Sequence, residues 1–336
     1  MDPFARYLPA LEEELRWAIT SLEDGPELLY GMLRYHLGWV DAEFRPAEFN
    51  GGKRLRPIFL LLACEAQGGD WYQALPAAAA VELLHNFSLI HDDIEDQDPQ
   101  RHGRPTLWTI WGEAQAINAG DALFALAYRA ILSLDSVNLT PDQVLQAVNR
   151  YTNTVLQLTV GQCLDLSFEN ETIVDEAAYL RMISGKTAAL LGLACELGGL
   201  VAGAPPAPTS ALRAFGSALG MAFQIQDDLL GLWGDPERTG KPVGSDLRHR
   251  KKTLPIGHGL TRSPALQALL AQPELDDGTV QEALIHLEAA GSRTYTQSKV
   301  VEYHAEALQA LARSGGTGEA QEALTALAEQ LLHRVK

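Results

Sequence analysis

The chain has 336 residues, and its formal charge at pH 7 is −17, from 26 basic and 43 acidic residues. This acidic balance argues against binding to a nucleic-acid backbone, and an anionic substrate would need local cations or metal ions to enter. Apolar residues make up 46% of the chain and aromatic residues only 7%. Much of the apolar content is Ala and Leu, which favours packed helices over sheets. We therefore predict an all-α protein in which residues 1–336 form a single domain.

Cysteines and apolar runs bear on the compartment. Cys64, Cys163 and Cys195 are widely spaced in apolar runs, so we expect reduced core thiols in a cytoplasmic protein. Residues 1–20 carry several acidic side chains and do not resemble a signal segment. The longest apolar stretch, residues 187–206, is interrupted by Glu196 and several glycines, so we expect no transmembrane segment.

The first elements in chain order are two helices, predicted over residues 9–22 and 27–38 from the spacing of apolar positions. Gly51 and Gly52 then precede three cations, Lys53, Arg54 and Arg56, and Pro57 fits the first turn of a following helix over 58–66. Cations beside a helix N-terminus favour phosphate binding. The alternative is an ordinary solvated basic turn.

A long helix is predicted over residues 76–98, and it ends in the first acidic stretch, residues 91–98. His85, Ser88, Asp92 and Asp96 share one stripe of this helix. Like charges one turn apart repel each other, so this placement is costly unless a cation lies between them. Carboxylate oxygens suit Mg²⁺, which usually bridges carboxylates and substrate phosphates. The basic loop 99–106 can return over the carboxylates and bind diphosphate oxygens.

Two more helices are predicted over residues 107–134 and 142–168, and a third over 179–203. Gln162 and Asp165 are either a buried polar pair or part of a site. The third helix begins with a polar kink, residues 184–187, which is not a nucleotide-binding loop because Leu180 stands where glycine is required. Lys186 and Thr187 at a kink can still offer an ammonium, a hydroxyl and freed carbonyls to a ligand.

The second acidic stretch, residues 224–231, ends a helix predicted over 212–232, after a proline-rich connection at 205–208. Gln224, Asp227 and Asp228 follow one another at i, i+3 and i+4. In the turn-rich segment that follows, Lys241 and Lys251 are the better candidates for ligand contacts, whereas Arg248, Arg250 and Lys252 suit an ordinary charged loop. Two acidic stretches on different helices could hold one polyphosphate between them through metal ions.

Taken together, these residues resemble the trans-isoprenyl diphosphate synthases, the polyprenyl synthetase family. The resemblance covers Gly51 to Pro255 in the family's order, and geranylgeranyl diphosphate synthases are the type that it favours. The matching segments are residues 51–57, His85 with 88–91, 92–96, 101–106, 161–162 with 165–166, 185–187, 223–228 and 239–241.

The resemblance implies helices that surround a deep central cavity, a homodimer, and Mg²⁺ as cofactor. It implies that isopentenyl diphosphate condenses head to tail with an allylic diphosphate, by ionisation, condensation and elimination. Metal ligands would be Asp92, Asp96 and Asp227, with Asp228 close by. Isopentenyl diphosphate would bind at Gly52, Lys53, Arg56 and His85, with His102 beside them. The allylic diphosphate would bind at Arg101, Lys186, Thr187, Gln224, Lys241 and Lys251.

Three departures from the family's pattern concern the site. His102 replaces an arginine that contacts isopentenyl diphosphate, Arg104 replaces a common lysine, and Gly231 replaces the third aspartate of the second acidic motif. Because Asp227 would make the direct metal contact, we expect Gly231 to be compatible with activity, and Gly231→Asp to preserve it.

Product length would depend on Phe87 and Ser88, which lie about one helical turn before Asp92, a step of ~5.4 Å that is comparable to one isoprene unit. The resemblance implies a C20 product, geranylgeranyl diphosphate, because a ring at this place beside a short acidic motif often accompanies C20 products in the family; C15 follows, and then longer chains. Two other functions remain open. A terpene cyclase would share the metal-bound carboxylates, but it would not need Lys53, Arg56 and His85 for a second diphosphate. A non-catalytic subunit of a heteromeric synthase is the other alternative, and His102 and Gly231 motivate it.

Overall fold

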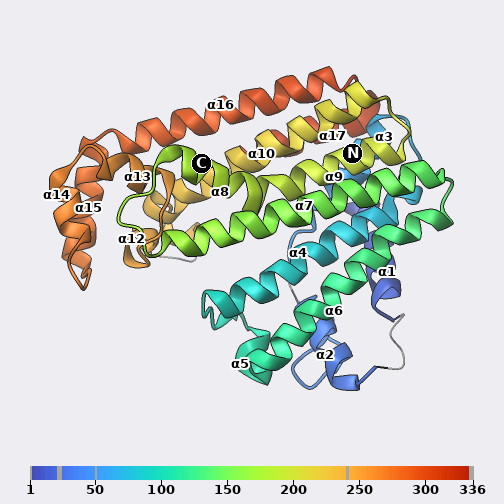
Figure 1. Ribbon diagram of the computed structural model, residues 1–336, viewed down its shortest axis with the longest axis horizontal. Helices are drawn as coiled ribbons and strands as arrows, with labels where there is room; N and C mark the ends of the chain where they lie inside the picture. The colour runs from blue at the N-terminus through green and yellow to red at the C-terminus, as the bar shows by residue number, and fades with distance from the viewer. Residues whose placement is uncertain (1, 21–24, 50, 240–241, 333–336) are drawn as a thin grey trace. The chain divides into compact units, whose positions relative to one another are not determined.

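A computed structural model describes residues 2–20, 25–49, 51–239 and 242–332, with the side chains of Arg238, Thr239 and Leu332 left aside. In this part of the chain nearly all regular structure is helical, which confirms the predicted all-α class (Figure 1). The strands are confined to one short hairpin, in which Gln100 pairs with Pro105 and Arg101 with Arg104.

The chain divides into two compact units. Unit 1 comprises residues 1–149, 197–205 and 317–323, and unit 2 comprises 150–196, 206–316 and 324–336. The elements up to residue 136 belong to unit 1: α1 (Pro3–Thr20), α2 (Glu27–His36), α3 (Leu55–Ala66), η1 (Trp71–Ala74), α4 (Leu75–Glu95), β1 (Gln100–Arg101), β2 (Arg104–Pro105), α5 (Leu107–Trp111), α6 (Glu113–Leu132) and η2 (Ser133–Ser136).

Three helices pass from one unit into the other: α7 (Pro141–Phe168), α9 (Ala189–Val201) and α17 (Gly318–Leu332). The remaining elements lie in unit 2: α8 (Glu176–Ile183), the π-helical turn η3 (Ser184–Ala188), α10 (Pro206–Trp233), α11 (Pro236–Thr239), α12 (Ser245–Arg248), α13 (Leu254–Leu260), α14 (Pro264–Leu270), α15 (Asp277–Ala289) and α16 (Ser292–Arg313).

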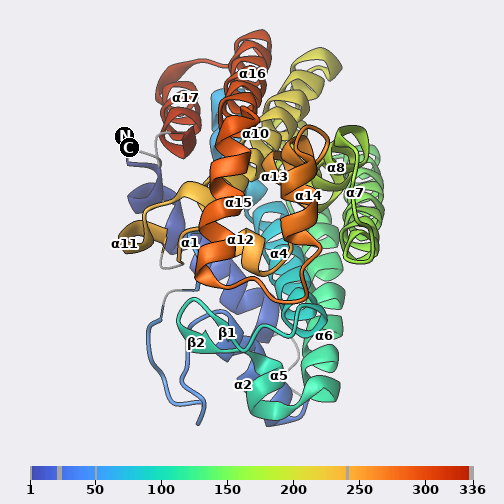
Figure 2. The ribbon, with the colours of Figure 1, turned by 90° about the vertical axis from the view of Figure 1, so that its left-hand side faces the viewer.

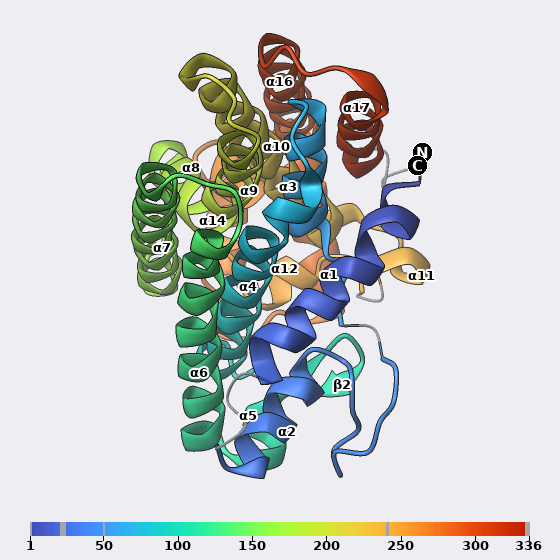
Figure 3. The same ribbon diagram turned by 90° about the vertical axis from the view of Figure 1, so that its right-hand side faces the viewer.

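Unit 1 is built around α4, which packs against α1, α3 and α6 (Figure 3). Ala77–Leu84 of α4 are fully or almost fully buried, as are Ile58–Cys64 of α3. The small alanines of α4 allow close helix packing, and its buried length leaves polar side chains mainly toward its C-terminal end. The first acidic stretch therefore ends a core helix of this unit.

Unit 2 is organised by α10 and α16, which lie side by side (Figure 1). An apolar cluster that includes Met182, Ile225, Leu229 and Leu254 joins α10 to α8 and α13. A second cluster joins α13, α14 and α15, the short helices in the foreground of Figure 2. The second acidic stretch therefore also ends a core helix.

Four expectations from the sequence need correction. Pro206 to Pro208 form the first turn of α10 and not a connection, because proline is tolerated where the amide has no helical partner. Gly112, with φ 85°, divides the predicted helix 107–134 into α5 and α6. The long acidic helix ends at Glu95 and not at Asp98. Cys64 and Cys195 are buried free thiols as expected, but Cys163 is exposed on α7.

α6 and the turn that follows it are long and apolar enough, by length and composition alone, to span a membrane. In the structure its Ala119, Leu123, Leu126 and Ala127 are buried, and α6 packs along α4. This packing is that of a core helix of unit 1, and Ile117 and Leu132 are left exposed on its outer side.

Candidate functional site

The glycine loop before α3 is fixed by Arg54. This residue caps α3 in a left-handed conformation (φ 49°), and its buried guanidinium pairs with Glu12 at 2.9 Å and Glu82 at 2.8 Å. The same guanidinium donates hydrogen bonds to the carbonyls of Gly51 and Leu37. Arg54 therefore does not serve as one of the three cations predicted for a phosphate. It holds the loop that presents Lys53 and Arg56.

Arg56 and His85 form a polar pair between α3 and α4. Arg56 Nη1 lies 3.0 Å from His85 Nε2, and burial together with the Arg56 charge holds the pKa of His85 well below its usual range. His85 is thus neutral and accepts a hydrogen bond from Arg56. The Nε of Arg56 is buried and has no hydrogen-bond partner among the described residues. A half-buried cation with an unused, buried donor suits an anionic ligand.

The β1–β2 hairpin brings two further predicted residues to this part of unit 1. Arg101 Nε donates to Asp93 Oδ1 at 2.6 Å, and burial raises the pKa of Asp93 to about 6 against the opposing effect of Arg101. His102 stands at the turn with φ 53°, and a Cβ placed on Gly52 would come 3.9 Å from its Nε2. The hairpin therefore brings His102 to the glycine loop, as the predicted isopentenyl diphosphate site requires.

A small cleft lies beside the hairpin, and Asp93, Arg101 and His102 are among its lining residues. His36, at the end of α2, also lines it, and its pKa is lowered to about 3 by burial and by the neighbouring arginines. Arg104 stacks on the rings of Tyr35 and Phe49, at 3.8 and 4.0 Å, and donates to the carbonyls of Tyr35 and Val40. Arg104 is thus occupied in holding the hairpin.

Asp92 and Asp96 lie one turn apart at the end of α4, where the amide of Asp96 donates to the carbonyl of Asp92 at 2.8 Å. Asp92 is half-buried and Asp96 is exposed. Across the described ranges, no group of three or more His, Cys, Asp or Glu side chains is arranged to hold a metal by itself. The carboxylates of Asp92 and Asp96 nevertheless fit a hard cation such as Mg²⁺, which takes its other ligands from substrate phosphates and water.

The two residues predicted to set product length lie on α4 as expected. The half-buried ring of Phe87 packs against Phe124 of α6 with ring centroids 4.9 Å apart, and against His91 at 4.7 Å. Ser88 donates to the carbonyl of His85 at 2.8 Å. Phe87 is therefore a fixed ring one turn before Asp92.

In unit 2, the predicted polar kink is the π-helical turn Ser184–Ala188. Lys186 Nζ pairs with Asp165 Oδ2 of α7 at 2.5 Å. Gly161 and Gly185 allow this contact, since a Cβ on Gly161 would come 2.2 Å from the backbone N of Lys186, and one on Gly185 2.5 Å from the carbonyl O of Gln157. Asp165 thus pairs with Lys186 and fixes the position of its ammonium group.

Thr187 continues into a chain of hydrogen bonds on α10. Thr187 Oγ1 donates to Gln224 Oε1 at 2.8 Å, and Gln224 Nε2 donates to Asp228 Oδ1 at 3.3 Å. Asp228 Oδ2 accepts from the Tyr179 hydroxyl and, at 3.1 Å, from the amide of Leu254. Burial raises the pKa of Asp228 to about 7, against these hydrogen bonds. Both oxygens of Asp228 are engaged within the protein, so its contacts favour a structural role over the predicted metal contact.

Asp227 is exposed, next to Asp228 on α10, and Lys251 is exposed after α12. The backbone amide of Lys251 donates to the carbonyl of Asp246 at 2.9 Å. Lys241, the other cation predicted here, lies outside the described residues.

The carboxylate of Asp246 occupies the space next to Gly231. A Cβ on Gly231 would come 2.0 Å from Asp246 Oδ2, and Asp246 is 8% exposed. Gly231→Asp therefore requires Asp246 to move, which adds a stability cost to the substitution that the sequence suggested would be harmless. A buried carboxylate thus stands beside the position where the family's third aspartate is missing.

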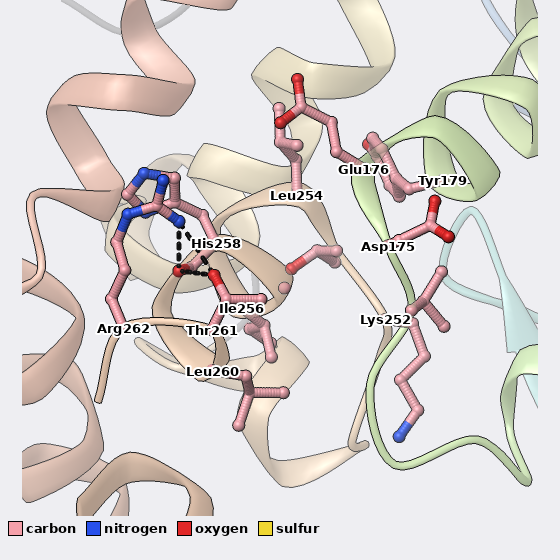
Figure 4. A pocket seen from close by; sticks show the side chains of 13 residues that line it. Asp175, Glu176, Tyr179, Lys252, Leu254, Ile256, His258, Leu260, Thr261 and Arg262 are labelled. Carbon is pink, nitrogen blue, oxygen red and sulfur yellow. Dashed lines mark hydrogen bonds between the residues drawn. The ribbon is translucent and has the colours of Figure 1, made fainter. Parts of the chain in front are cut away.

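A cavity of about 170 Å³ is lined by Tyr179 and Leu254 (Figure 4). Its lining also includes the apolar Ile256 and Leu260 and the polar His258 and Arg262. Tyr179 and Leu254 thus both line the cavity and donate hydrogen bonds to Asp228.

Sequence reasoning missed His36, Tyr179 and Asp246. Each stands in a segment with no motif signal: the end of an early helix, an apolar helical face, and a charged loop. Only Asp246 had an indirect signal in the sequence: Gly231 stands where an aspartate was expected, and Asp246 lies beside Gly231 in the structure.

Carboxylates that end core helices, with cations beside them, define a class of all-α proteins that handle diphosphates. The polyprenyl synthetase family model matches residues 39–287, so the chain belongs to that family of trans-isoprenyl diphosphate synthases. Its activity is that of a short-chain prenyl diphosphate synthase, a prenyltransferase.

Three known proteins illustrate the similarity. A (2E,6E)-farnesyl diphosphate synthase of Mycobacterium bovis is 42% identical over 293 residues, covering 84% of this chain and 80% of its own. A geranylgeranyl diphosphate synthase of Mycobacterium tuberculosis is 46% identical over 252 residues, covering 75% and 71%. The crystal structure of a Caulobacter crescentus polyprenyl synthase, complexed with calcium and isoprenyl diphosphate, has a TM-score of 0.82 at 30% identity and covers 100% of this chain and 98% of its own. The isoprenoid synthase fold follows for this chain, and the cyclase alternative is not favoured.

Proposed function

We propose that this chain makes geranylgeranyl diphosphate (C20) from isopentenyl diphosphate and an allylic diphosphate, with C15 as the next candidate. The observation that carries the chain length is the ring of Phe87, packed on Phe124 at 4.9 Å one turn before Asp92. Relatives named for C15 and for C20 products both resemble the chain, so the ring and not the similarity supports C20.

In this proposal residues 1–336 act as a single catalytic domain. Lys53 and Arg56, with neutral His85, bind isopentenyl diphosphate together with Gly52 and His102. Lys186 and Lys251 bind the allylic diphosphate, together with Arg101 and Lys241. Arg56 supports its assignment best, because its buried Nε has an unused donor.

Divalent metal belongs to the proposal through Asp92, Asp96 and Asp227, with Mg²⁺ as the ion. A Caulobacter relative crystallised with calcium and isoprenyl diphosphate supports a hard divalent cation. When bound, the metal would supply positive charge for the departing diphosphate. Asp228 has its oxygens committed within the protein, so we assign it to positioning in place of the metal contact.

The chain's own residues then account for the steps. Lys186 and Lys251 stabilise the charge that grows on the diphosphate as the allylic C–O bond breaks. Thr187 and Gln224 direct oxygen dipoles at the resulting carbocation, and apolar walls exclude the water that would quench it. The isopentenyl double bond supplies the electron pair of the new C–C bond. The released diphosphate accepts the proton whose loss forms the product double bond.

We also propose a homodimer in the cytoplasm. α6 exposes a stripe that includes the apolar Ile117 and Leu132, 43% and 50% exposed, and the charged Asp121. Ala114 and Ala125 lie exposed on the same side of α6. Uncovered apolar surface at helical spacing suits a protein–protein contact. The free thiols of Cys64, Cys163 and Cys195 suit a reducing compartment.

One assay tests the function. The purified chain is incubated with Mg²⁺, labelled isopentenyl diphosphate and farnesyl diphosphate, and the products are analysed by mass. A C20 diphosphate is expected, with a loss of at least about 100-fold in kcat for Asp92→Ala or Asp227→Ala. Asp142→Ala, on the exposed start of α7, is the matched control. A hydrocarbon product would indicate a cyclase. A C15 product from geranyl diphosphate, with none from farnesyl diphosphate, would indicate a C15 synthase, and no product from either primer would indicate a non-catalytic subunit.

A further inference from the structure

We propose that Tyr179 is a positioning residue for the condensation. Its hydroxyl fixes the Asp228 carboxylate, which orients the Gln224 amide and, through it, the Thr187 hydroxyl. This inference deepens the proposed function, since it gives the second aspartate of the acidic pair a task other than metal binding.

The series of hydrogen bonds from Tyr179 to Thr187 has a fixed direction, which is set by the donor and acceptor atoms of its members. Gln224 has a donor end, Nε2, and an acceptor end, Oε1, which the fold could exchange by rotating the amide. Asp228 removes this freedom in its ionised form, the form that accepts from Tyr179 and Leu254, because a carboxylate only accepts and therefore faces Nε2, at 3.3 Å. Oε1 then faces Thr187, so the Thr187 hydroxyl must donate to it, at 2.8 Å.

The consequence for Thr187 is chemical. Its proton is committed to Gln224, and its oxygen presents lone pairs to a ligand. An oxygen that presents lone pairs stabilises a nearby carbocation and delivers no proton to it. With the amide reversed, the Gln224 donor end would face Thr187, and the hydroxyl proton would be free to point at the ligand.

Tyr179 holds Asp228, the residue at the start of this series of hydrogen bonds. It is 3% exposed and Asp228 is 4% exposed, so their contact is removed from water, where hydrogen bonds are strongest. Oδ2 of Asp228 also accepts from the Leu254 amide at 3.1 Å, which leaves Oδ1 for Gln224. Without the Tyr179 hydroxyl, the carboxylate would keep one donor at Oδ2 and could rotate away from Gln224. Tyr179 and Thr187 lie in the same segment, on α8 and on the π-helical turn that follows it.

The test is a double-mutant cycle with Tyr179→Phe and Thr187→Val. Tyr179→Phe alone is expected to lower kcat by roughly 10- to 100-fold with KM for the allylic diphosphate nearly unchanged, as for a misplaced group that does not bind substrate. In the Thr187→Val background the same change should have little further effect. Tyr303→Phe is the control, a half-buried tyrosine of α16 packed on the same apolar cluster. Equal losses in both backgrounds would show that Tyr179 acts through general stability, and the inference would fall.

A second readout needs no catalysis. The side-chain amide signals of Gln224, assigned by their absence in Gln224→Glu, are followed by NMR in the substrate-free protein. Tyr179→Phe should shift them and reduce their protection from hydrogen exchange, whereas Tyr303→Phe should not. Unchanged Gln224 signals in Tyr179→Phe would overturn the inference whether or not the chain makes a C20 product, so failure of the inference and failure of the proposed function are separable.

Discussion

Three charged residues, Arg54, Asp93 and Asp228, are withdrawn from water, and each has specific partners. Arg54 is 5% exposed and has two carboxylates, Asp93 is 3% exposed and has Arg101, and Asp228 is 4% exposed and has a tyrosine hydroxyl and an amide. Burying a charge costs several kcal/mol unless it is paired. Removing one partner of such a pair costs about 3–5 kcal/mol, so these contacts fix geometry more than they add stability.

His36 is a histidine that the fold keeps neutral. Its folded-state pKa is about 3, lowered by burial and by Arg101 and Arg54, against ~6.5 when unfolded. The unfolded chain therefore takes up a proton near pH 6.5 while the folded chain does not, so stability is complete above pH 6.5 and falls as pH drops toward 3. At pH 5.5 this one group should lower the free energy of unfolding by about 1.4 kcal/mol.

His36→Asn should remove this contribution from the fall in the free energy of unfolding between pH 7.5 and pH 5.5, as measured by urea unfolding at both pH values. The same change at His286, a half-buried residue of α15, serves as the control. An identical loss in His36→Asn and in the natural chain would contradict the assignment.

At the scale of elements, α4 links the first acidic stretch to product length. Phe87→Ala removes the ring that packs on Phe124, one turn of ~5.4 Å before Asp92. The freed space matches about one isoprene unit, so products longer than those of the natural chain are expected by mass spectrometry. Leu89→Ala, on the same helix but lining the cleft beside Arg101, should leave the length unchanged. Unchanged length in Phe87→Ala would remove Phe87 from this role.

The main helices could be predicted because their information is local. Apolar spacing and the acidic ends placed α4 and α10, and the Ser-Gly-Lys-Thr run predicted the turn that is now seen as π-helical. The partners of the charged residues could not be predicted, since Arg54 and Glu82 are 28 residues apart and Tyr179 and Asp228 are 49 apart. No periodicity reports such pairs. The same limit hid Asp246 beside Gly231.

At the scale of the whole molecule, the exposed stripe of α6 makes the oligomeric state testable. Ile117→Asp places a charge on that stripe, which should prevent a second copy from covering it. Light scattering after gel filtration should then give the mass of one chain, 36.5 kDa, whereas the proposed homodimer of the natural chain should give twice that value. Ile285→Asp is the control, since Ile285 is 68% exposed on α15. A dimeric Ile117→Asp variant would place the interface elsewhere.

The close approach of Gly161 and Gly185 has a consequence for engineering and for natural variation. Since neither position has room for a methyl group, the place of Lys186 and Thr187 is determined by main chain against main chain. Selection for new substrates can therefore reshape the residues around this turn but not the turn itself. A library randomised at both positions should return only glycine among its active members.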